Sequence, residues 1–194
     1  MVGGSSKKNQ DIGSHYLKNH PSETKRLLKQ LNVIVNAYVS KQVEAGAKAV
    51  QIFEALGGTL SGSEFRDVCL PILKELAEMF KRDNDIPVMI FARDQCGFNR
   101  ELEEYYDGVT IDTNYDLEEV KGLKGVVQGG FKPEILIGEN NEENRGRIRK
   151  AVEEMFEKVE GGKYIANLGE GMGGKENVEL VQVFLDTVRE VSGR

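Results

Sequence analysis

The apolar residues of this chain switch repeatedly between the spacing of a β-strand and the spacing of an α-helix, and this alternation limits the possible folds. Five short apolar runs have the composition of buried strands: residues 49–54, 87–92, 108–112, 125–129 and 164–168. The stretches between these runs have helical spacing and are long enough for right-handed crossovers. The sequence therefore predicts an α/β fold with about five parallel βα repeats.

Several helices can be placed from their apolar spacing and their terminal residues. Ser61 and Glu64 have the spacing of a capping box at the start of a helix that Pro71 should kink. Shorter helices are expected at residues 99–106 and 116–121, and a longer one ends at residues 161–162. The first long helix, which ends at Gly46, has one apolar stripe of Leu27, Leu31, Ile34 and Tyr38. The last helix has an expected inner stripe of Val181, Phe184, Leu185, Val188 and Val191.

Composition narrows the class of protein. The 194 residues are 39% hydrophobic, which is enough for one packed core, so residues 21–194 are expected to form a single domain after a flexible tail at residues 1–20. A formal charge of −6 argues against a nucleic-acid surface, and no apolar run is long enough to span a membrane. Cys69 and Cys96 provide no disulfide framework, so we expect a reducing, cytoplasmic location.

We expect the functional residues where the strands end, because ligands of parallel α/β sheets bind beyond the carboxyl ends of the strands. Asp94 and Asp112 follow strands directly and are candidate functional carboxylates, with helix caps or loop hydrogen bonds as the alternative. Arg93 and Lys132 are the basic residues of this rim and are suited to bind ligand carboxylates, unless they are solvated surface charges. Glu170 lies between glycines, where burial would favour the protonated form that a general acid needs.

The glycine-rich turn at residues 169–174 is a further candidate. Its backbone N–H groups are suited to bind an anion, although it matches no P-loop or dinucleotide-binding motif. A mobile connection is the alternative interpretation.

Several segments occur in an order that is characteristic of one enzyme family. They are residues 42–47, 51–54, 70–71, 90–94, 111–112, 128–129 with Pro133, and 163–169. From about Val39 to Val191 the chain resembles the C-terminal portion of uroporphyrinogen decarboxylases. The resemblance implies a (β/α)8 barrel that removes acetate carboxyl groups from a tetrapyrrole without a cofactor. Because five βα units can be counted, we expect a partial TIM-barrel-like fold.

The resemblance also implies roles for the rim residues. Glu170 and Asp94 become candidate catalytic groups. The candidate substrate-binding residues are Arg93, Asp112, Gln128, Lys132 and Gly169. The chain departs from the family pattern because Ala55 replaces a serine, Glu170 replaces a histidine, and the family's opening arginine motif has no counterpart. We therefore expect reduced or lost decarboxylase activity, or a non-catalytic relative that binds a tetrapyrrole or a protein.

The same resemblance implies a second alternative, because the corrinoid-dependent methyltransferases are a neighbouring branch of this superfamily. Those enzymes hold zinc with a His-x-Cys pair and a later cysteine. The matching positions here are Asp94, Cys96 and Glu170, which form a poor zinc site because zinc prefers sulfur and nitrogen ligands. Cys69 lies at an inward helical position and is expected to belong to the core.

Five units of a barrel would leave unpaired strand edges and an open apolar face. We therefore expect a homodimer, a partner protein that completes the barrel, or an open sheet with the helix at residues 21–45 packed across the gap.

Overall fold

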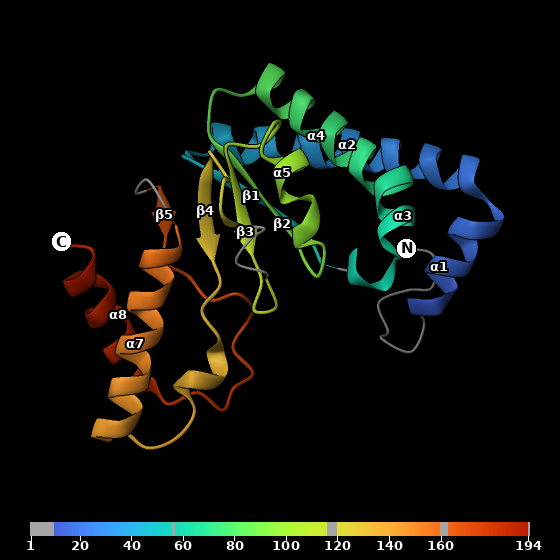
Figure 1. Cartoon of the computed structure of the whole chain (residues 1–194). Coiled ribbons are helices and arrows are strands. Elements are labelled where there is room, and N and C mark those ends of the chain that lie inside the picture. The colour runs from blue at the N-terminus through green and yellow to red at the C-terminus, as the bar shows by residue number, and fades with distance from the viewer. Residues whose placement is uncertain (1–9, 56, 116–119, 160–162, 194) are drawn as a thin grey trace. The chain divides into compact units, whose positions relative to one another are not determined.

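The computed structural model describes residues 10–55, 57–115, 120–159 and 163–193. It confirms an α/β fold in which five parallel strands occur in alternating order with helices, as part of a TIM-barrel-like architecture (Figure 1). The contacts of the chain divide it into two compact units, residues 1–95 with 104–107 and residues 96–103 with 108–194. The prediction of a single domain over residues 21–194 is not tested by this division and stays a prediction.

The N-terminal unit holds two strands and two long helices. β1 (Val50–Glu54) pairs in parallel with β2 (Val88–Ala92). The helices α2 (Pro21–Glu44) and α4 (Leu70–Asp83) lie side by side in this unit (Figure 1). Its shorter elements are α1 (Gln10–Asn19), η2 (Gly57–Thr59), α3 (Gly62–Glu64) and η3 (Phe65–Cys69).

Helix α1 lies in the stretch that was expected to be a flexible tail. Lys18 in its last turn has its Nζ 3.3 Å from Oε1 of Glu64, so the helix is attached to α3 by an ion pair. For residues 10–19 the structure therefore differs from the expected tail. Residues 1–9 lie outside the described part of the chain.

Helix α2 packs a different face from the one that its apolar spacing predicts. Asn32 and Asn36 are buried against α4, where Asn32 donates a 2.8 Å hydrogen bond to the carbonyl oxygen of Ile72 and Asn36 donates a 2.6 Å hydrogen bond to Oδ2 of Asp83. Three apolar side chains of the helix are instead exposed: Val33, Ile34 and Tyr38. Polar contacts thus help to attach α2 to α4. Of the predicted apolar stripe, Ile34 and Tyr38 are exposed, while Leu27 and Leu31 are half-buried.

The segment from α3 to α4 confirms the capping box and has an irregular turn just before Pro71. The Glu64 amide donates to the Ser61 hydroxyl, and the Ser61 amide donates to the Glu64 carboxylate. Pro71 follows one turn of π-helix, η3, in which the amide of Leu70 donates to the carbonyl of Phe65. A π-turn is one of the known causes of a helix kink, and this one ends two residues before Pro71.

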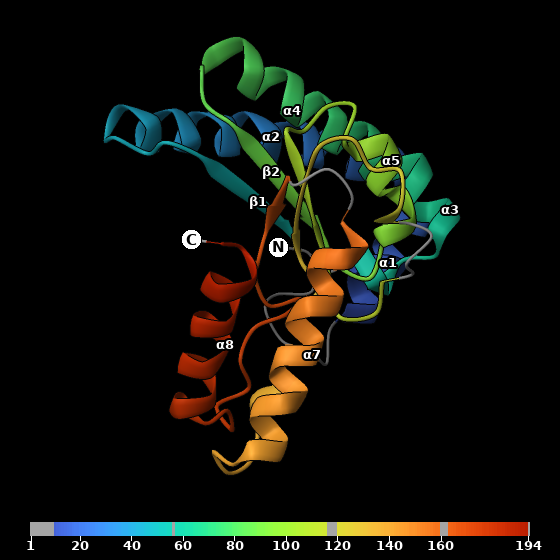
Figure 2. The ribbon, with the colours of Figure 1, turned by 60° about the vertical axis from the view of Figure 1, so that its left-hand side comes forward.

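The C-terminal unit holds three parallel strands. β4 (Val126–Gly129) pairs with β3 (Gly108–Ile111) on one side and with β5 (Tyr164–Ile165) on the other. The long helices α7 (Glu142–Lys158) and α8 (Val178–Val191) lie side by side (Figure 2). The shorter elements are η4 (Cys96–Phe98), α5 (Asn99–Leu102) and η5 (Pro133–Leu136).

Some expected elements of this unit are shorter than the sequence suggests, and others cannot be compared. The strand expected at residues 164–168 ends at Ile165, although Leu168 still forms one isolated bridge with Phe131. Most of the helix expected at residues 116–121 and the helix end expected at residues 161–162 lie outside the described residues. In α8, Phe184 is buried as predicted, but Leu185 is 42% exposed because Leu180 and Thr187 take the inner positions.

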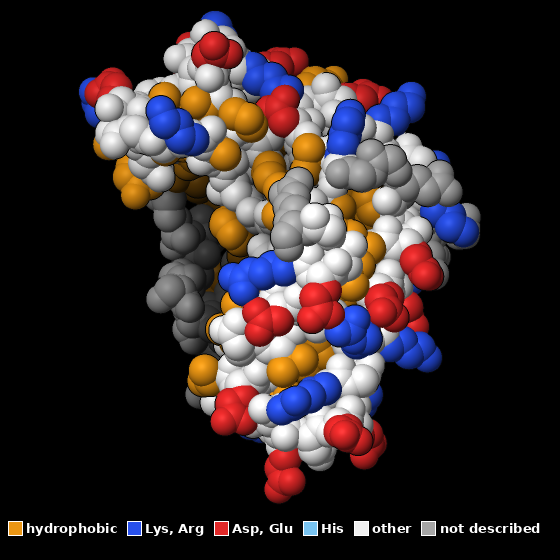
Figure 3. Space-filling model, turned by 90° about the vertical axis from the view of Figure 1, so that its left-hand side faces the viewer, with side chains coloured by type: hydrophobic (Ala, Val, Ile, Leu, Met, Phe, Trp, Pro, Cys, Tyr) orange, Lys and Arg blue, Asp and Glu red, His pale blue; other side chains and the backbone are white. Residues whose placement is uncertain are grey.

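The core of this unit is formed where η5, α7 and α8 meet the end of β4. Its buried members are Phe131, Leu136, Ile148, Val152, Met155, Leu180 and Phe184. Figure 3 shows acidic and basic side chains intermixed on one face of the molecule. On α7, Glu154 forms ion pairs with Lys150 and Lys158. Among the described residues, no helix is long and apolar enough to cross a membrane.

Candidate functional site

In the N-terminal unit, one buried side chain fixes the loops that follow both strands. The side-chain amide of Gln95 donates to the carbonyl oxygens of Gly57 (2.8 Å) and Leu60 (3.2 Å). The amide of Arg93 donates to the carbonyl of Glu54 at 3.1 Å and continues the strand pairing for one more residue. Gln95 was not predicted as a structural residue, because a glutamine after a strand resembles any other polar loop residue.

The two predicted residues of this unit, Arg93 and Asp94, lie on its exposed rim. Nε of Arg93 is 3.8 Å from Oδ2 of Asp94, and about half of each side chain is exposed. Asp94 has a positive φ of 58°, and a Cβ at Gly58 would lie 2.5 Å from the Cβ of Asp94. The glycine therefore makes room for the left-handed turn that presents the Arg93–Asp94 pair.

In the C-terminal unit, a polar pair occupies the middle of the sheet. Thr110 and Gln128 are opposite one another in the β3–β4 register, both are buried, and Nε2 of Gln128 lies 3.1 Å from Oγ1 of Thr110. Alternation along a strand places Asp112 on the same face as Thr110, beyond the end of β3. Asp112 is only 4% exposed, and its Oδ1 accepts a 2.7 Å hydrogen bond from the amide of Asn114.

Gly169 is in direct contact with the loop after β3. Its amide donates to the carbonyl of Phe131 at 2.8 Å, and a Cβ at this position would lie 2.7 Å from the backbone of Asp112 and Thr113. The structure thus brings together three predicted residues, Asp112, Gly169 and the adjoining, half-buried Glu170. The alternative role of Asp112, a hydrogen bond within its loop, is also present in the structure.

The glycine-rich turn already binds an anion, and that anion belongs to the chain itself. The amides of Gly173 and Gly174 each donate a 2.8 Å hydrogen bond to the carboxylate of Glu176. These backbone hydrogen bonds, with that of Gly173 the largest contribution, hold the pKa of Glu176 below its ordinary value. The backbone donors of this turn were predicted from its glycines, whereas Glu176 was not predicted as their acceptor.

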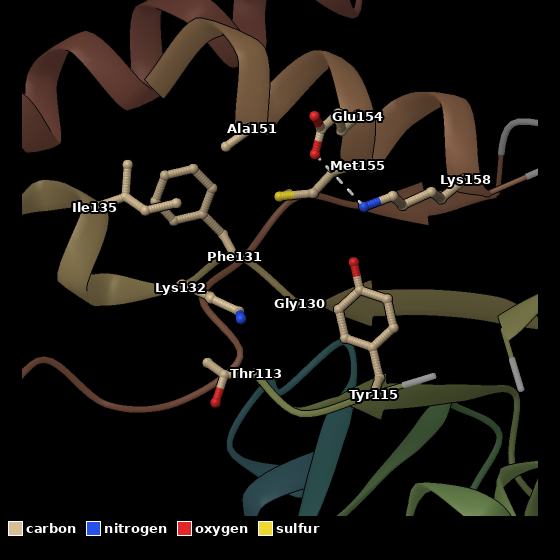
Figure 4. A pocket seen from close by; sticks show the side chains of 10 residues that line it. All are labelled: Thr113, Tyr115, Gly130, Phe131, Lys132, Ile135, Ala151, Glu154, Met155 and Lys158. Carbon is tan, nitrogen blue, oxygen red and sulfur yellow. Dashed lines mark ion pairs between the residues drawn. The ribbon is translucent and has the colours of Figure 1, made fainter. Parts of the chain in front are cut away.

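Lys132, in contrast, lies at a pocket on the helix-covered side of the sheet. The pocket has a volume of about 290 Å³ and lies between α7 and the loops that follow β3 and β4 (Figure 4). Gly130 in its wall is packed against the side chain of Ile111, which alternates with Thr110 and so faces the other way. Lys132 is thus separated by the sheet from the face of Gln128, which the sequence had grouped with it.

The metal-binding alternative gains no support from the described side chains, which form no group of three or more His, Cys, Asp or Glu suited to hold a metal ion. The side chain of Cys96 lies outside the described part, so the set of Asp94, Cys96 and Glu170 stays a prediction. Burial raises the pKa of the Cys69 thiol to about 12. This agrees with the expectation that Cys69 is a core residue and not a thiolate ligand.

Comparison with known proteins identifies relatives over nearly the whole chain. The family model of uroporphyrinogen decarboxylase (URO-D) matches residues 1–191. Uroporphyrinogen decarboxylase of Francisella philomiragia is 31% identical over 199 residues, covering 99% of this chain and 56% of its own length. The enzyme of Salinibacter ruber is 30% identical over 197 residues, with coverages of 99% and 54%. The similarity therefore extends N-terminal of Val39, where the sequence analysis had placed its start.

A solved structure gives a fold-level comparison. A methyltransferase from Methanosarcina mazei has a TM-score of 0.64 and 15% sequence identity, and the match covers 84% of this chain and 47% of that one. At this identity the likeness concerns the fold alone and does not favour methyl transfer. The chain spans about half the length of the curated relatives that it matches.

Proposed function

The chain belongs to the uroporphyrinogen decarboxylase family, and on this premise we propose that it binds a tetrapyrrole and has reduced or no decarboxylase activity. In this proposal the protein uses no cofactor. The family membership gives a decarboxylase ancestry within haem biosynthesis, while the present activity of the chain is the part that is proposed.

One observation supports ligand binding in particular, and it is the contact of Gly169 with the backbone of Asp112. This contact places a buried carboxylate beside the turn that carries Glu170, at the carboxyl ends of parallel strands. A carboxylate is an acceptor suited to the N–H groups of a pyrrole ring. In this proposal Asp112 accepts those hydrogen bonds, with Gln128 and Gly169 beside it. Arg93 belongs to the N-terminal unit and is proposed separately as a residue that binds a carboxylate.

The loss of activity is proposed from two substitutions relative to the family pattern. Ala55 lacks the hydroxyl of the serine that it resembles in position, and Glu170 replaces a histidine. An alanine neither donates nor accepts a hydrogen bond through its side chain, and a carboxylate beside the carboxylates of a substrate is repelled by them. Any remaining proton transfer is assigned to Glu170 or Asp94.

The test combines turnover with binding. The protein is incubated anaerobically with uroporphyrinogen, coproporphyrinogen is measured by chromatography, and porphyrin binding is followed by fluorescence. We expect saturable binding together with turnover that is absent or far below that of the Francisella enzyme. Turnover equal to that enzyme would contradict the loss of activity, and absence of binding would contradict the ligand.

A conservative variant tests the role of Asp112. Asp112→Asn keeps an oxygen for the amide of Asn114 and removes the charge, so we expect porphyrin binding to weaken about tenfold with little change in folding. Asp186→Asn on the exposed side of α8 is the matched control and should leave binding unchanged. Equal binding by Asp112→Asn and the control would remove Asp112 from the proposed site.

Association and location belong to the same proposal. We propose that the chain functions in the cytoplasm as a homodimer or with a partner that extends its sheet. Support comes from the exposed side chain of Phe53 on β1, which is 65% accessible, and from the exposed Val33, Ile34 and Tyr38 of α2.

A further inference from the structure

We propose that the pocket between α7 and the loops after β3 and β4 binds a small organic carboxylate with an apolar or aromatic body. This inference is independent of the proposed tetrapyrrole function, because the pocket lies on the opposite side of the sheet from Thr110, Gln128 and Asp112. It is carried by the side chains that line the cavity (Figure 4).

Two lysines and one phenol supply the polar part of the pocket. In Figure 4 the Nζ of Lys158 points into the cavity above the ring of Tyr115, and the side chain of Lys132 points in from the loop after β4. Thr113 also lines the pocket from the loop after β3. The two ammonium groups and the phenol thus face one space from three separate segments, an arrangement suited to a carboxylate.

The donors of both lysines remain largely available. Nζ of Lys158 lies 3.7 Å from Oε2 of Glu154, which is an ion pair beyond hydrogen-bond distance. Lys132 forms no ion pair within the part of the chain that the structure describes. Among the described residues of the lining, Glu154 is the one acidic side chain, so two lysine charges face one negative charge and an added carboxylate would balance them.

The rest of the wall is apolar and limits the size of the ligand. Ile135 and Ala151 line one side, and the thioether of Met155 lies between them and Lys158 (Figure 4). A sulfur atom at this place is a favourable neighbour for an aromatic ring. A volume of about 290 Å³ lies at the lower end of the range for ligand pockets, so it admits one ring with a short acid arm and excludes four linked rings.

The first test is a titration of the full chain with 3-phenylpropionate, followed by calorimetry or by amide chemical shifts. We expect saturable binding with a dissociation constant of about 1 mM or below, as is usual for a ligand of this size. The neutral 3-phenylpropanamide and acetate should each bind at least about tenfold more weakly, because one lacks the charge and the other lacks the ring. Inorganic phosphate is titrated in parallel, and binding of phosphate without binding of 3-phenylpropionate would overturn the proposed ligand class.

Variants on one helix then locate the site. Lys158→Gln should weaken binding of 3-phenylpropionate about tenfold, and Glu154→Gln should strengthen it because a competing carboxylate is removed. Lys150→Gln is the matched control, since Lys150 also pairs with Glu154, is highly exposed and does not line the pocket. Equal weakening by Lys150→Gln and Lys158→Gln would show a non-specific charge effect and contradict the site.

Two further variants make the result independent of any single lysine. Lys132→Gln should also weaken binding about tenfold, because Lys132 contributes the second positive charge of the lining. Ala151→Leu should abolish binding by filling the apolar side of the cavity, with thermal unfolding used to show that the variant is folded. Binding that survives Ala151→Leu in a folded protein would place the ligand elsewhere.

Discussion

At the scale of single residues, Glu176 shows how a loop is ordered by its own charge. Its carboxylate accepts hydrogen bonds from the amides of Gly173 and Gly174, and these bonds lower its pKa. A group whose pKa is lower in the folded state stabilises that state above its unfolded pKa, and the contribution is lost as the pH falls through the folded pKa. Order in this loop therefore depends on an ionised Glu176.

We expect the amide resonances of Gly173 and Gly174 to titrate together, with a midpoint below the ordinary glutamate value of 4.5. The measurement is a series of ¹⁵N–¹H spectra between pH 7 and pH 2.5. Glu176→Gln should abolish the transition at both amides, because the charged acceptor is gone. A midpoint at or above 4.5 would show that the hydrogen bonds do not form in solution.

The other prediction at this scale concerns the effect of a Gly169 substitution on stability. A methyl group at Gly169 would lie 2.7 Å from backbone atoms of Asp112 and Thr113, which cannot move aside as a flexible side chain would. We expect Gly169→Ala to lower the free energy of unfolding by about 1–3 kcal/mol, as measured by urea denaturation. Gly171→Ala, which has nothing within 4 Å of the added atom, should change it by less than about 0.5 kcal/mol. Equal effects of the two would contradict the close approach.

The residues of the site were predictable only in part, for a physical reason. Asp112, Gly169 and Glu170 were selected because the carboxyl ends of parallel strands are known places for ligands, and their roles stay predictions. Gln95 and Glu176 were missed because their hydrogen bonds are to backbone groups, and no spacing in the sequence encodes those partners. Lys132 was grouped with the other rim residues, whereas it lines the pocket beside α7, three residues after the end of β4.

At the scale of elements, α2 is the helix whose packing departs most from its pattern. It buries Asn32 and Asn36 against α4 and leaves Ile34 and Tyr38 exposed. Period analysis detects a helix from its apolar residues and assumes that they face inward. Here the helix boundaries were predicted correctly while the packed face was not.

Paired substitutions on α2 distinguish the two faces. Asn32→Ala removes a buried 2.8 Å hydrogen bond to α4, and we expect it to lower the free energy of unfolding by about 1 kcal/mol. Ile34→Gln changes a side chain that is 63% exposed, so the expected change is within about 0.5 kcal/mol. Both are measured by urea denaturation. A larger loss for Ile34→Gln than for Asn32→Ala would mean that another surface covers the apolar stripe in solution.

The strands were predicted more securely than the connections between them. All five apolar runs correspond to strands or contain one. The pattern is clearest for β2 and β3, which are largely buried and have nearly continuous apolar sequences. The expected helix at residues 99–106 is shorter, α5 (Asn99–Leu102), since Tyr106 leaves the helical path to donate a 2.7 Å hydrogen bond to the carbonyl of Leu73.

At the scale of the whole molecule, exposed apolar side chains predict association. Phe53 packs edge-to-face on Phe91, with ring centroids 6.0 Å apart, and still remains 65% exposed. Sedimentation velocity should therefore show a dimer or a larger species, and Phe53→Ser should raise the dissociation constant at least about fivefold. Val178→Ser, at another highly exposed apolar residue, should leave association unchanged. A monomer at every concentration would contradict the proposed self-association.

The order of the strands has a consequence for how the chain reaches its folded state. In each unit, strands that are neighbours in space are also successive in the sequence, β1 with β2, and β3 with β4 and then β5. Pairing between successive strands closes a shorter loop than pairing between strands far apart in the sequence, and a shorter loop loses less entropy. A ribosome releases the chain from its N-terminus, so every new strand emerges after the one to which it will be hydrogen-bonded. Each new strand of a unit can therefore pair with a strand that has already been synthesised.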